Sequence, residues 1–189
     1  VSLVLASQTF AIQVGKILLI RHGEKDAKAK SGDVHLNERG EIRASALAEL
    51  FFPRNFDNPD AGLFHFDEIS SVVAQSATER HPSKRKIETA RPIVDAGHVP
   101  LKLFDHQDIS GTCEYLSSES DQGRTTLVVW DHTTISDLAN ELLRLPRGTI
   151  QWPMNRYDVV WEILPDTTTL RQYCQHLLFG DPWCPINPI

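Results

Sequence analysis

The chain has 189 residues, a formal net charge of −6 and a hydrophobic fraction of 41%. Its length is enough for one domain with a buried core, and its composition is typical of a globular protein. The acidic balance argues against non-specific nucleic-acid binding, which requires an excess of Lys and Arg. No stretch is long and apolar enough to span a bilayer, and the three cysteines are too few for a disulfide scaffold.

The N-terminal segment, residues 1–11, is apolar at first and then rich in small residues. Thr9 and Ala11 are placed like the −3 and −1 positions of a signal-peptidase site, so the segment is either a clipped signal-peptide remnant or an ordinary N-terminal extension. In the first case the protein is secreted or periplasmic, and Cys174 and Cys184 become a plausible disulfide. In the second case it is cytoplasmic and its cysteines are free.

The predicted elements alternate between apolar strands and amphipathic helices. In chain order they are a strand over 16–20, a helix over 38–50, a loop over 51–62, a strand over 68–73, a helix over 83–94, a strand over 125–130, a helix over 134–143 and a strand over 157–163. Ser83 is placed to be the N-cap of the second helix, and residues 167–178 can pair with the last strand as a hairpin. We therefore predict for residues 12–189 a single α/β domain, a three-layer sandwich with a central mixed, mostly parallel sheet flanked by helices.

Two of the predicted strands end in histidine. The first leads into Arg21 and His22, and the strand over 125–130 leads into His132. Because the active sites of open α/β sheets lie outside the carboxyl ends of the strands, we expect both imidazoles at one rim. A basic cluster, residues 80–86, follows the second strand. Arginine and histidine together favour a phosphate group, because a guanidinium binds two of its oxygens and a neutral imidazole can attack its phosphorus.

Four stretches of the chain carry this chemistry. They are Arg21-His22-Gly23-Glu24, then Leu36-Asn37-Glu38-Arg39-Gly40 followed by Ala44 and Leu47, then Arg85-Lys86-Ile87-Glu88-Thr89-Ala90, and Val128-Val129-Trp130-Asp131-His132. In this order they resemble the motifs of the histidine phosphatase superfamily, which includes the phosphoglycerate mutases. The resemblance spans residues 16–163 and implies a single histidine phosphatase-like domain with the fold predicted above.

The resemblance also implies a reaction through a phosphohistidine. His22 would be the nucleophile, and Arg21, Arg85 and His132 would complete the pocket around the phosphoryl oxygens, while Gly23 would let the backbone approach the phosphate. No metal or cofactor is implied, and the expected partner is a small phosphorylated substrate or phosphate. Phosphomonoester hydrolysis is the first hypothesis. A weakly active or inactive member that binds a phosphorylated ligand or protein is the second, and a phosphomutase is the third.

The second arginine of the pocket has an alternative. Arg80 also fits the family's usual spacing from Ser76, but the register of the Thr-Ala helix favours Arg85. Arg80, Lys84 and Lys86 are then expected on a solvated face.

A general acid must protonate the leaving alkoxide. One branch of the family supplies an Asp directly after the second histidine, where this chain has Thr133. The other branch supplies a Glu after the arginine helix, where residues 103–111 contain Asp105 and Asp108 but no Glu. Asp108 is the first candidate and Asp105 the second, and the alternative is that both are solvated loop carboxylates.

Three further residues are candidates for binding the substrate, namely Glu24, Lys25 and Asn37. The remaining histidines show no metal-ligand spacing and are expected to be structural or exposed. They are His35, His65, His81, His98, His106 and His176.

Overall fold

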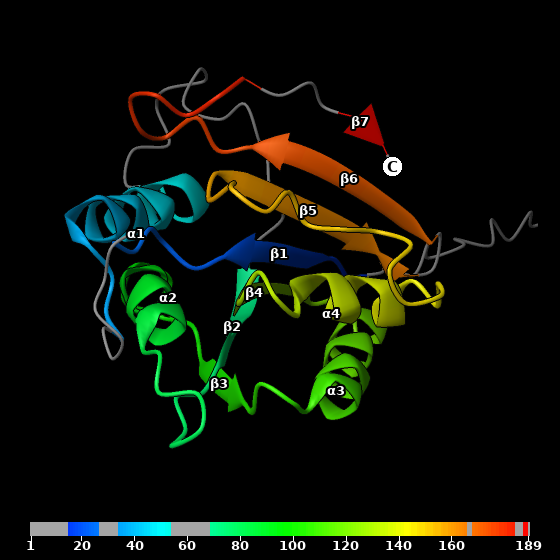
Figure 1. Ribbon diagram of the computed structural model, residues 1–189. Helices are drawn as coiled ribbons and strands as arrows, with labels where there is room; N and C mark the ends of the chain where they lie inside the picture. Colours follow the sequence, from blue (N-terminus) through cyan, green and yellow to red (C-terminus); the bar gives the residue numbers. More distant parts are fainter. Residues whose placement is uncertain (1–14, 27–33, 54–68, 166–167, 184–186, 189) are drawn as a thin grey trace, which may run out of the picture.

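A single sheet organises the protein. The computed structural model describes residues 15–26, 34–53, 69–165, 168–183 and 187–188 (Figure 1). The strands are β1 (Ile17–Arg21), β2 (Ile69–Gln75), β3 (Leu101–Phe104), β4 (Thr125–Trp130), β5 (Val159–Leu164), β6 (Thr169–Cys174) and β7 (Asn187–Pro188). The helices are α1 (Glu38–Phe51), α2 (Arg85–Gly97), α3 (Ile109–Asp121) and α4 (Ile135–Leu142).

The sheet is mixed, with strand order β3-β2-β4-β1-β5-β6-β7. The first four strands of this order are parallel, whereas β5 runs antiparallel to β1, β6 to β5, and β7 to β6. Both β1 and β4 are buried along their whole length. Continuous apolar runs form such strands because helices cover both faces of the sheet.

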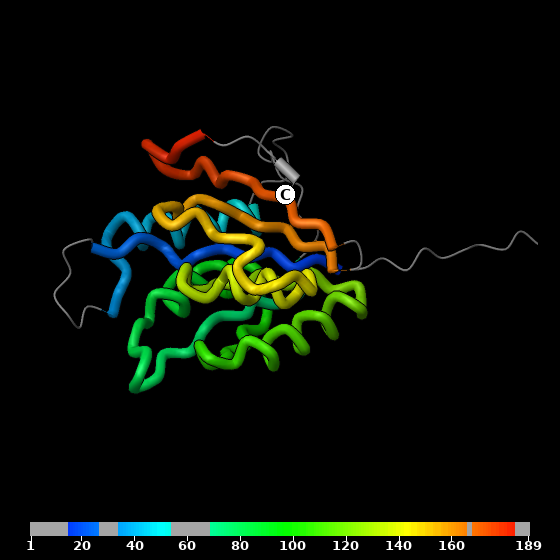
Figure 2. Tube along the Cα trace, turned by 45° about the vertical axis from the view of Figure 1, so that its right-hand side comes forward, coloured from blue at the N-terminus to red at the C-terminus, as the bar shows by residue number. Residues whose placement is uncertain are grey.

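Helices cover the two faces in pairs (Figure 1, Figure 2). α1 and α2 pack on one face of the sheet, in a hydrophobic core with Leu18 and Ile20 of β1. α3 and α4 pack on the other face, in a second core with Leu19 of the same strand. Successive side chains of a strand point to opposite faces, so one short run supplies both cores. The predicted three-layer α/β sandwich is therefore confirmed.

Several predicted details differ from the structure. The prediction that Ser83 caps the second helix is wrong, because Lys84 occupies the N-cap of α2 and makes no side-chain capping bond. The pattern also missed β3 and α3. β3 has only four residues, and α3 buries a weakly apolar face, which leaves little hydrophobic periodicity to detect. That face consists of Thr112, Cys113, Leu116 and Ser120.

Other expectations concern residues outside the ranges that the structure describes. Residues 1–11, most of the predicted loop over 51–62, and Cys184 lie outside the described residues. Cys174 is disulfide-bonded, and Cys113 is a free, buried cysteine. Within the described ranges, no helix is long and apolar enough to cross a membrane.

Candidate active site

The carboxyl ends of β1 and β4 bring two distant sequence segments together. The strands are parallel neighbours, with Arg21 opposite Trp130 in the register. The His22 amide continues the ladder by donating to the Trp130 carbonyl at 3.2 Å. His22 and Asp131 therefore leave the sheet side by side, and side-chain atoms of His22, Asp131 and His132 lie within 4.8 Å of one another. The structure thus brings the two expected histidines to one rim.

His22 is held as a neutral imidazole with a free lone pair. Its Nδ1 lies 2.7 Å from the Gly23 carbonyl oxygen, which can only accept, so Nδ1 carries the proton. Its Nε2 is buried, has no hydrogen-bond partner and lies 3.7 Å from Asp131 Oδ2, which is too far for a hydrogen bond. Burial lowers the pKa of His22 and outweighs the raising effect of Asp131. Nε2 is thus available as a nucleophile at neutral pH.

Arg21 is clamped beside His22 by the segment before β5. Its guanidinium donates to the Met154 carbonyl at 2.7 Å and to the Tyr157 hydroxyl at 3.0 Å. It also stacks on the Tyr157 ring, 3.8 Å from the centroid. Its Nε is buried without a partner. A fixed guanidinium with an unused N–H is suited to bind an oxyanion. Nothing in the sequence motifs pointed to Tyr157.

Asp131 places a negative charge beside His22. Its Oδ1 accepts from Thr133 N at 2.9 Å and from Thr133 Oγ1 at 2.8 Å, and it lies 3.2 Å from His132 Nδ1. Burial raises the pKa of Asp131, but the neighbouring His132 and His22 rings and the bonds from Thr133 hold this pKa well below its usual range. The carboxylate is therefore ionised at neutral pH. The sequence motifs did not single out this residue.

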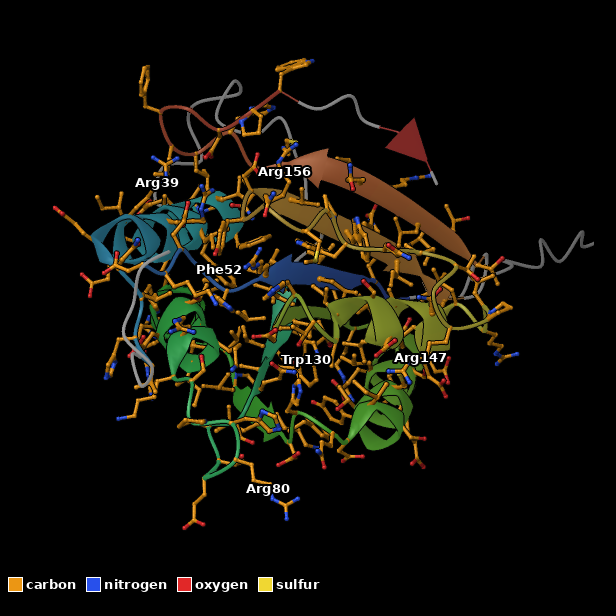
Figure 3. All side chains as sticks on the ribbon, viewed as in Figure 1. Arg39, Phe52, Arg80, Trp130, Arg147 and Arg156 are labelled. Atoms are coloured by element: carbon orange, nitrogen blue, oxygen red, sulfur yellow. The ribbon has the colours of Figure 1, made fainter. Side chains whose placement is uncertain are left out.

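The start of α2 supplies further cations. Arg85 is buried, and its Nε donates to the His35 carbonyl at 2.8 Å. Lys86 is only 3% exposed, so the expectation that it lies on a solvated face is wrong. Burial lowers the pKa of Lys86, and the charge of Asp131 raises it. In contrast, Arg80 is exposed and extends away from the sheet (Figure 3). Arg85 and Lys86 are thus buried at the start of α2 whereas Arg80 is exposed, and the binding of a phosphate by Arg85 stays a prediction.

Two close backbone contacts fix the segment after β1. A Cβ on Gly23 would lie 2.7 Å from the Gly40 carbonyl oxygen, and a Cβ on Gly40 would lie 2.4 Å from the Glu24 carbonyl oxygen. The glycines thus allow the segment to pack on the start of α1. The Gly23 amide donates to Thr89 Oγ1 at 2.8 Å, and that hydroxyl donates to the Arg85 carbonyl at 2.8 Å. α2 therefore anchors the segment that follows β1.

We expect Thr89→Val to destabilise the protein by about 1–3 kcal/mol, because it leaves the buried Gly23 N–H without an acceptor. Urea unfolding would measure this loss. Thr112→Val is the matched control, because the Thr112 hydroxyl only donates to the Asp108 carbonyl, which also accepts the Thr112 amide. We expect less than about 1 kcal/mol there. Equal losses in the two variants would contradict the anchoring role.

The substrate-binding candidates have partners within the protein. The Glu24 carboxylate accepts from Arg43 Nη2 at 2.8 Å and from Arg39 Nε at 3.1 Å. Asn37 is the N-cap of α1, and its side-chain oxygen accepts from Gly40 N at 2.9 Å. These contacts account for both side chains without a ligand. Lys25 is half-buried, and its contact with a substrate stays a prediction.

The acid candidates are likewise engaged locally. Asp105 Oδ1 accepts from Gln107 N at 2.9 Å, and Asp108 caps α3 by accepting from Gly111 N at 3.0 Å. Both residues are exposed. The structure therefore does not bring either carboxylate into contact with His22, and the carboxylate nearest to Nε2 among the described residues is that of Asp131.

Gln75 connects a third histidine to the rim. The Gln75 side-chain oxygen Oε1 accepts from the Asp131 backbone N–H at 3.1 Å. This contact orients the Gln75 side chain so that its own Nε2 donates to Nδ1 of His106 at 3.0 Å. The proton of neutral His106 is therefore on Nε2. The His106 ring packs on His81, with centroids 4.2 Å apart. No sequence pattern indicated this role, because His106 lies in the loop between β3 and α3 and meets Gln75 through the fold.

A separate groove lies between α1 and α2, with a volume of about 570 Å³. Its ionisable lining residues are Glu49 and Asp95, both acidic. Two carboxylates repel a phosphate group, so this groove does not suit the anion chemistry of the rim.

Comparisons with known proteins agree with this fold. The family described as the histidine phosphatase superfamily (branch 1) matches residues 17–62. A mycobacterial glucosyl-3-phosphoglycerate phosphatase structure is 14% identical, covers 85% of this chain and 96% of its own, and has a TM-score of 0.56. An alpha-ribazole phosphatase from Shigella flexneri is 16% identical, covers 79% and 90%, and has a TM-score of 0.51. No curated protein matches the chain. At these identities the structures show a shared fold. The family match over residues 17–62 and the shared fold confirm the resemblance to the histidine phosphatase superfamily that the motifs indicated.

Proposed function

We propose that the protein hydrolyses phosphomonoesters through a phosphohistidine on His22. The observation that carries the proposal is the state of that imidazole, whose Nδ1 is protonated toward Gly23 and whose buried Nε2 has a free lone pair beside Arg21. The substrate is a small phosphorylated molecule. The chemistry needs no group beyond this chain and water.

In the first step, Nε2 attacks phosphorus, the P–N bond forms, and the bond from phosphorus to the ester oxygen breaks. The leaving oxygen takes a proton from solvent water and departs as an alcohol, and the hydroxide left behind is neutralised by the proton that phosphate releases in the second step. In the second step, water attacks the phosphohistidine, releases inorganic phosphate and returns Nε2 to its lone-pair state. Arg21, Arg85 and Lys86 stabilise the charge on the phosphoryl oxygens in both steps. His132, at the same rim, is a further donor candidate.

Trapping the intermediate tests this proposal. The enzyme is mixed with p-nitrophenyl phosphate, quenched in alkali, in which phosphohistidine is stable, and analysed by mass spectrometry. We expect one phosphoryl group on wild-type protein, located on His22, and none on His22→Ala. Hydrolysis at equal rates by both proteins, with no phosphorylated species, would overturn the proposal.

The identity of the general acid can be tested at the two sequence candidates. Because Asp105 and Asp108 are exposed and bound to nearby backbone amides, we expect Asp105→Asn and Asp108→Asn each to lower kcat by less than about 10-fold. A true general acid contributes about 100- to 10,000-fold. Steady-state kinetics on a substrate with a poor leaving group, such as glycerol phosphate, separate the two cases. A loss in the larger range would restore that carboxylate as the acid.

Asp131 favours one second candidate, a member that binds a phosphorylated ligand with little turnover. Its carboxylate lies 3.7 Å from Nε2 and opposes the approach of phosphorus to that nitrogen, whereas Arg21 can still bind the phosphate oxygens. Isothermal titration with inorganic phosphate, run beside the p-nitrophenyl phosphate assay, distinguishes the candidates. Phosphate binding without measurable turnover would favour the binding protein.

The acidic limb of the pH profile is expected below the ordinary histidine range. Burial lowers the pKa of His22, so the neutral nucleophile persists at pH values where a solvent-exposed histidine is protonated. Asp131 raises this pKa, so Asp131→Asn should shift the limb to still lower pH. A plot of log kcat/KM against pH measures both positions. A shift to higher pH in the variant would contradict this assignment.

A further inference from the structure

Three ligand atoms converge at the rim in a pattern that suits a metal ion. His22 Nε2 lies 3.7 Å from Asp131 Oδ2, and His132 Nδ1 lies 3.2 Å from Asp131 Oδ1. One atom from each of the three residues lies within 4.8 Å of the others. Two imidazole nitrogens and a carboxylate with open positions form a ligand set that Zn²⁺ and similar divalent ions accept.

The hydrogen bonding of these atoms is incomplete without a cation. The Nε2 of His22 and the Nδ1 of His132 are both buried and make no hydrogen bond. The Nε2 lone pair of His22 faces Oδ2 of Asp131 at 3.7 Å, so two acceptor atoms face one another with no donor between them. Buried polar atoms nearly always have a hydrogen-bond partner, so two unpartnered ring nitrogens at one site are unusual. A metal ion would accept both lone pairs.

Surrounding groups already hold the ligands in orientation. The Gly23 carbonyl binds the Nδ1–H of His22 and so directs Nε2 toward the cluster. The amide and hydroxyl of Thr133 bind Oδ1 of Asp131. Carbonyl–histidine contacts and hydrogen-bonded carboxylates of this kind are usual around metal ligands. The side chains of Asp131 and His132 are 20% and 18% exposed, which gives an ion a path from solvent.

We propose that His22, Asp131 and His132 bind a divalent transition-metal ion such as Zn²⁺, and that the bound ion inhibits the enzyme. The ion takes the same Nε2 lone pair that attacks phosphorus, so metal binding and phosphohistidine formation exclude one another. Asp131 has opposite effects on the two ligands, because its charge attracts the cation and repels phosphate. Arg21 and Lys86 lie close enough to Asp131 for their positive charges to oppose the cation.

The test measures Co²⁺ binding by visible absorption and by calorimetry, which does not depend on turnover. We expect one ion per wild-type chain, displaced by vanadate, and binding at least about 10-fold weaker in Asp131→Asn and in His132→Gln. Vanadate should bind Asp131→Asn as tightly as wild type or more tightly. This opposite response to cation and anion separates loss of a ligand from general damage to the fold.

His81→Gln is the matched control, because His81 and His106 form a second histidine pair near the rim. It should bind Co²⁺ like the wild type. Loss of binding in His81→Gln, or unchanged Co²⁺ binding in Asp131→Asn, would overturn the proposal. Because these measurements use the metal alone, they remain decisive even if the protein hydrolyses no phosphomonoester.

Discussion

Replacing His22 by Ala is expected to lower kcat/KM for p-nitrophenyl phosphate by at least about 1,000-fold. The reason is the lack of a substitute. Of the two buried and unpartnered ring nitrogens at the rim, His22 Nε2 belongs to the residue next to Arg21, whereas His132 Nδ1 lies 3.2 Å from Asp131 Oδ1. A water molecule attacking directly would lose the positioning that a covalent intermediate provides.

The control for this variant must separate chemistry from folding. His22 is fully buried, so His22→Ala also removes packing, and His22→Asn serves as a second variant that leaves a smaller cavity. His98→Asn is the matched surface control, because His98 ends α2 with a positive φ of 49° that Asn accepts. We expect wild-type activity for His98→Asn and loss for both His22 variants with retained circular dichroism. Residual activity above about a tenth of wild type would contradict the nucleophile assignment.

Arg43→Met is expected to destabilise the protein by about 3–5 kcal/mol. Arg43 is 1% exposed and binds Glu24, Gln175 and Asp181, including 2.8 Å to Glu24 Oε1 and 2.7 Å to Asp181 Oδ1. Burial lowers the pKa of Arg43, but the bonds to Glu24 and Asp181 raise it overall, so the guanidinium stays charged. Removing it would leave two carboxylates without their central cation.

Urea unfolding measures this loss, with Arg147→Met as the control. Arg147 pairs with Asp137 at 2.6 Å, but its side chain is 82% exposed (Figure 3). Exposed pairs contribute little, so we expect a much smaller loss for the control. Similar small losses in both variants would show that the buried network does not hold α1 to the C-terminal segment. Because Glu24 follows the nucleophile segment directly, kcat should fall with stability in Arg43→Met.

Much of the fold was predictable because its signals are local. Each signal lies within one short stretch of sequence. These signals are the apolar runs of β1 and β4 and the helical spacing of the apolar residues in α1. Histidine at the ends of two such strands was enough to place His22 and His132 at one rim, since parallel strands share a carboxyl edge. The prediction that Ser83 caps α2 was wrong because the helix starts after Lys84. A favourable capping residue does not by itself determine where a helix begins.

The sequence by itself determined the α/β layering and the pairing of Arg21 and His22, because both depend on neighbours along the chain. Only the tertiary structure decided that Asp131 faces the His22 nitrogen, that Lys86 is buried beside the site and that Tyr157 supports Arg21. Those contacts join residues far apart in the chain, and their strength depends on burial. Burial and charge proximity follow from packing, and packing cannot be inferred from local pattern alone.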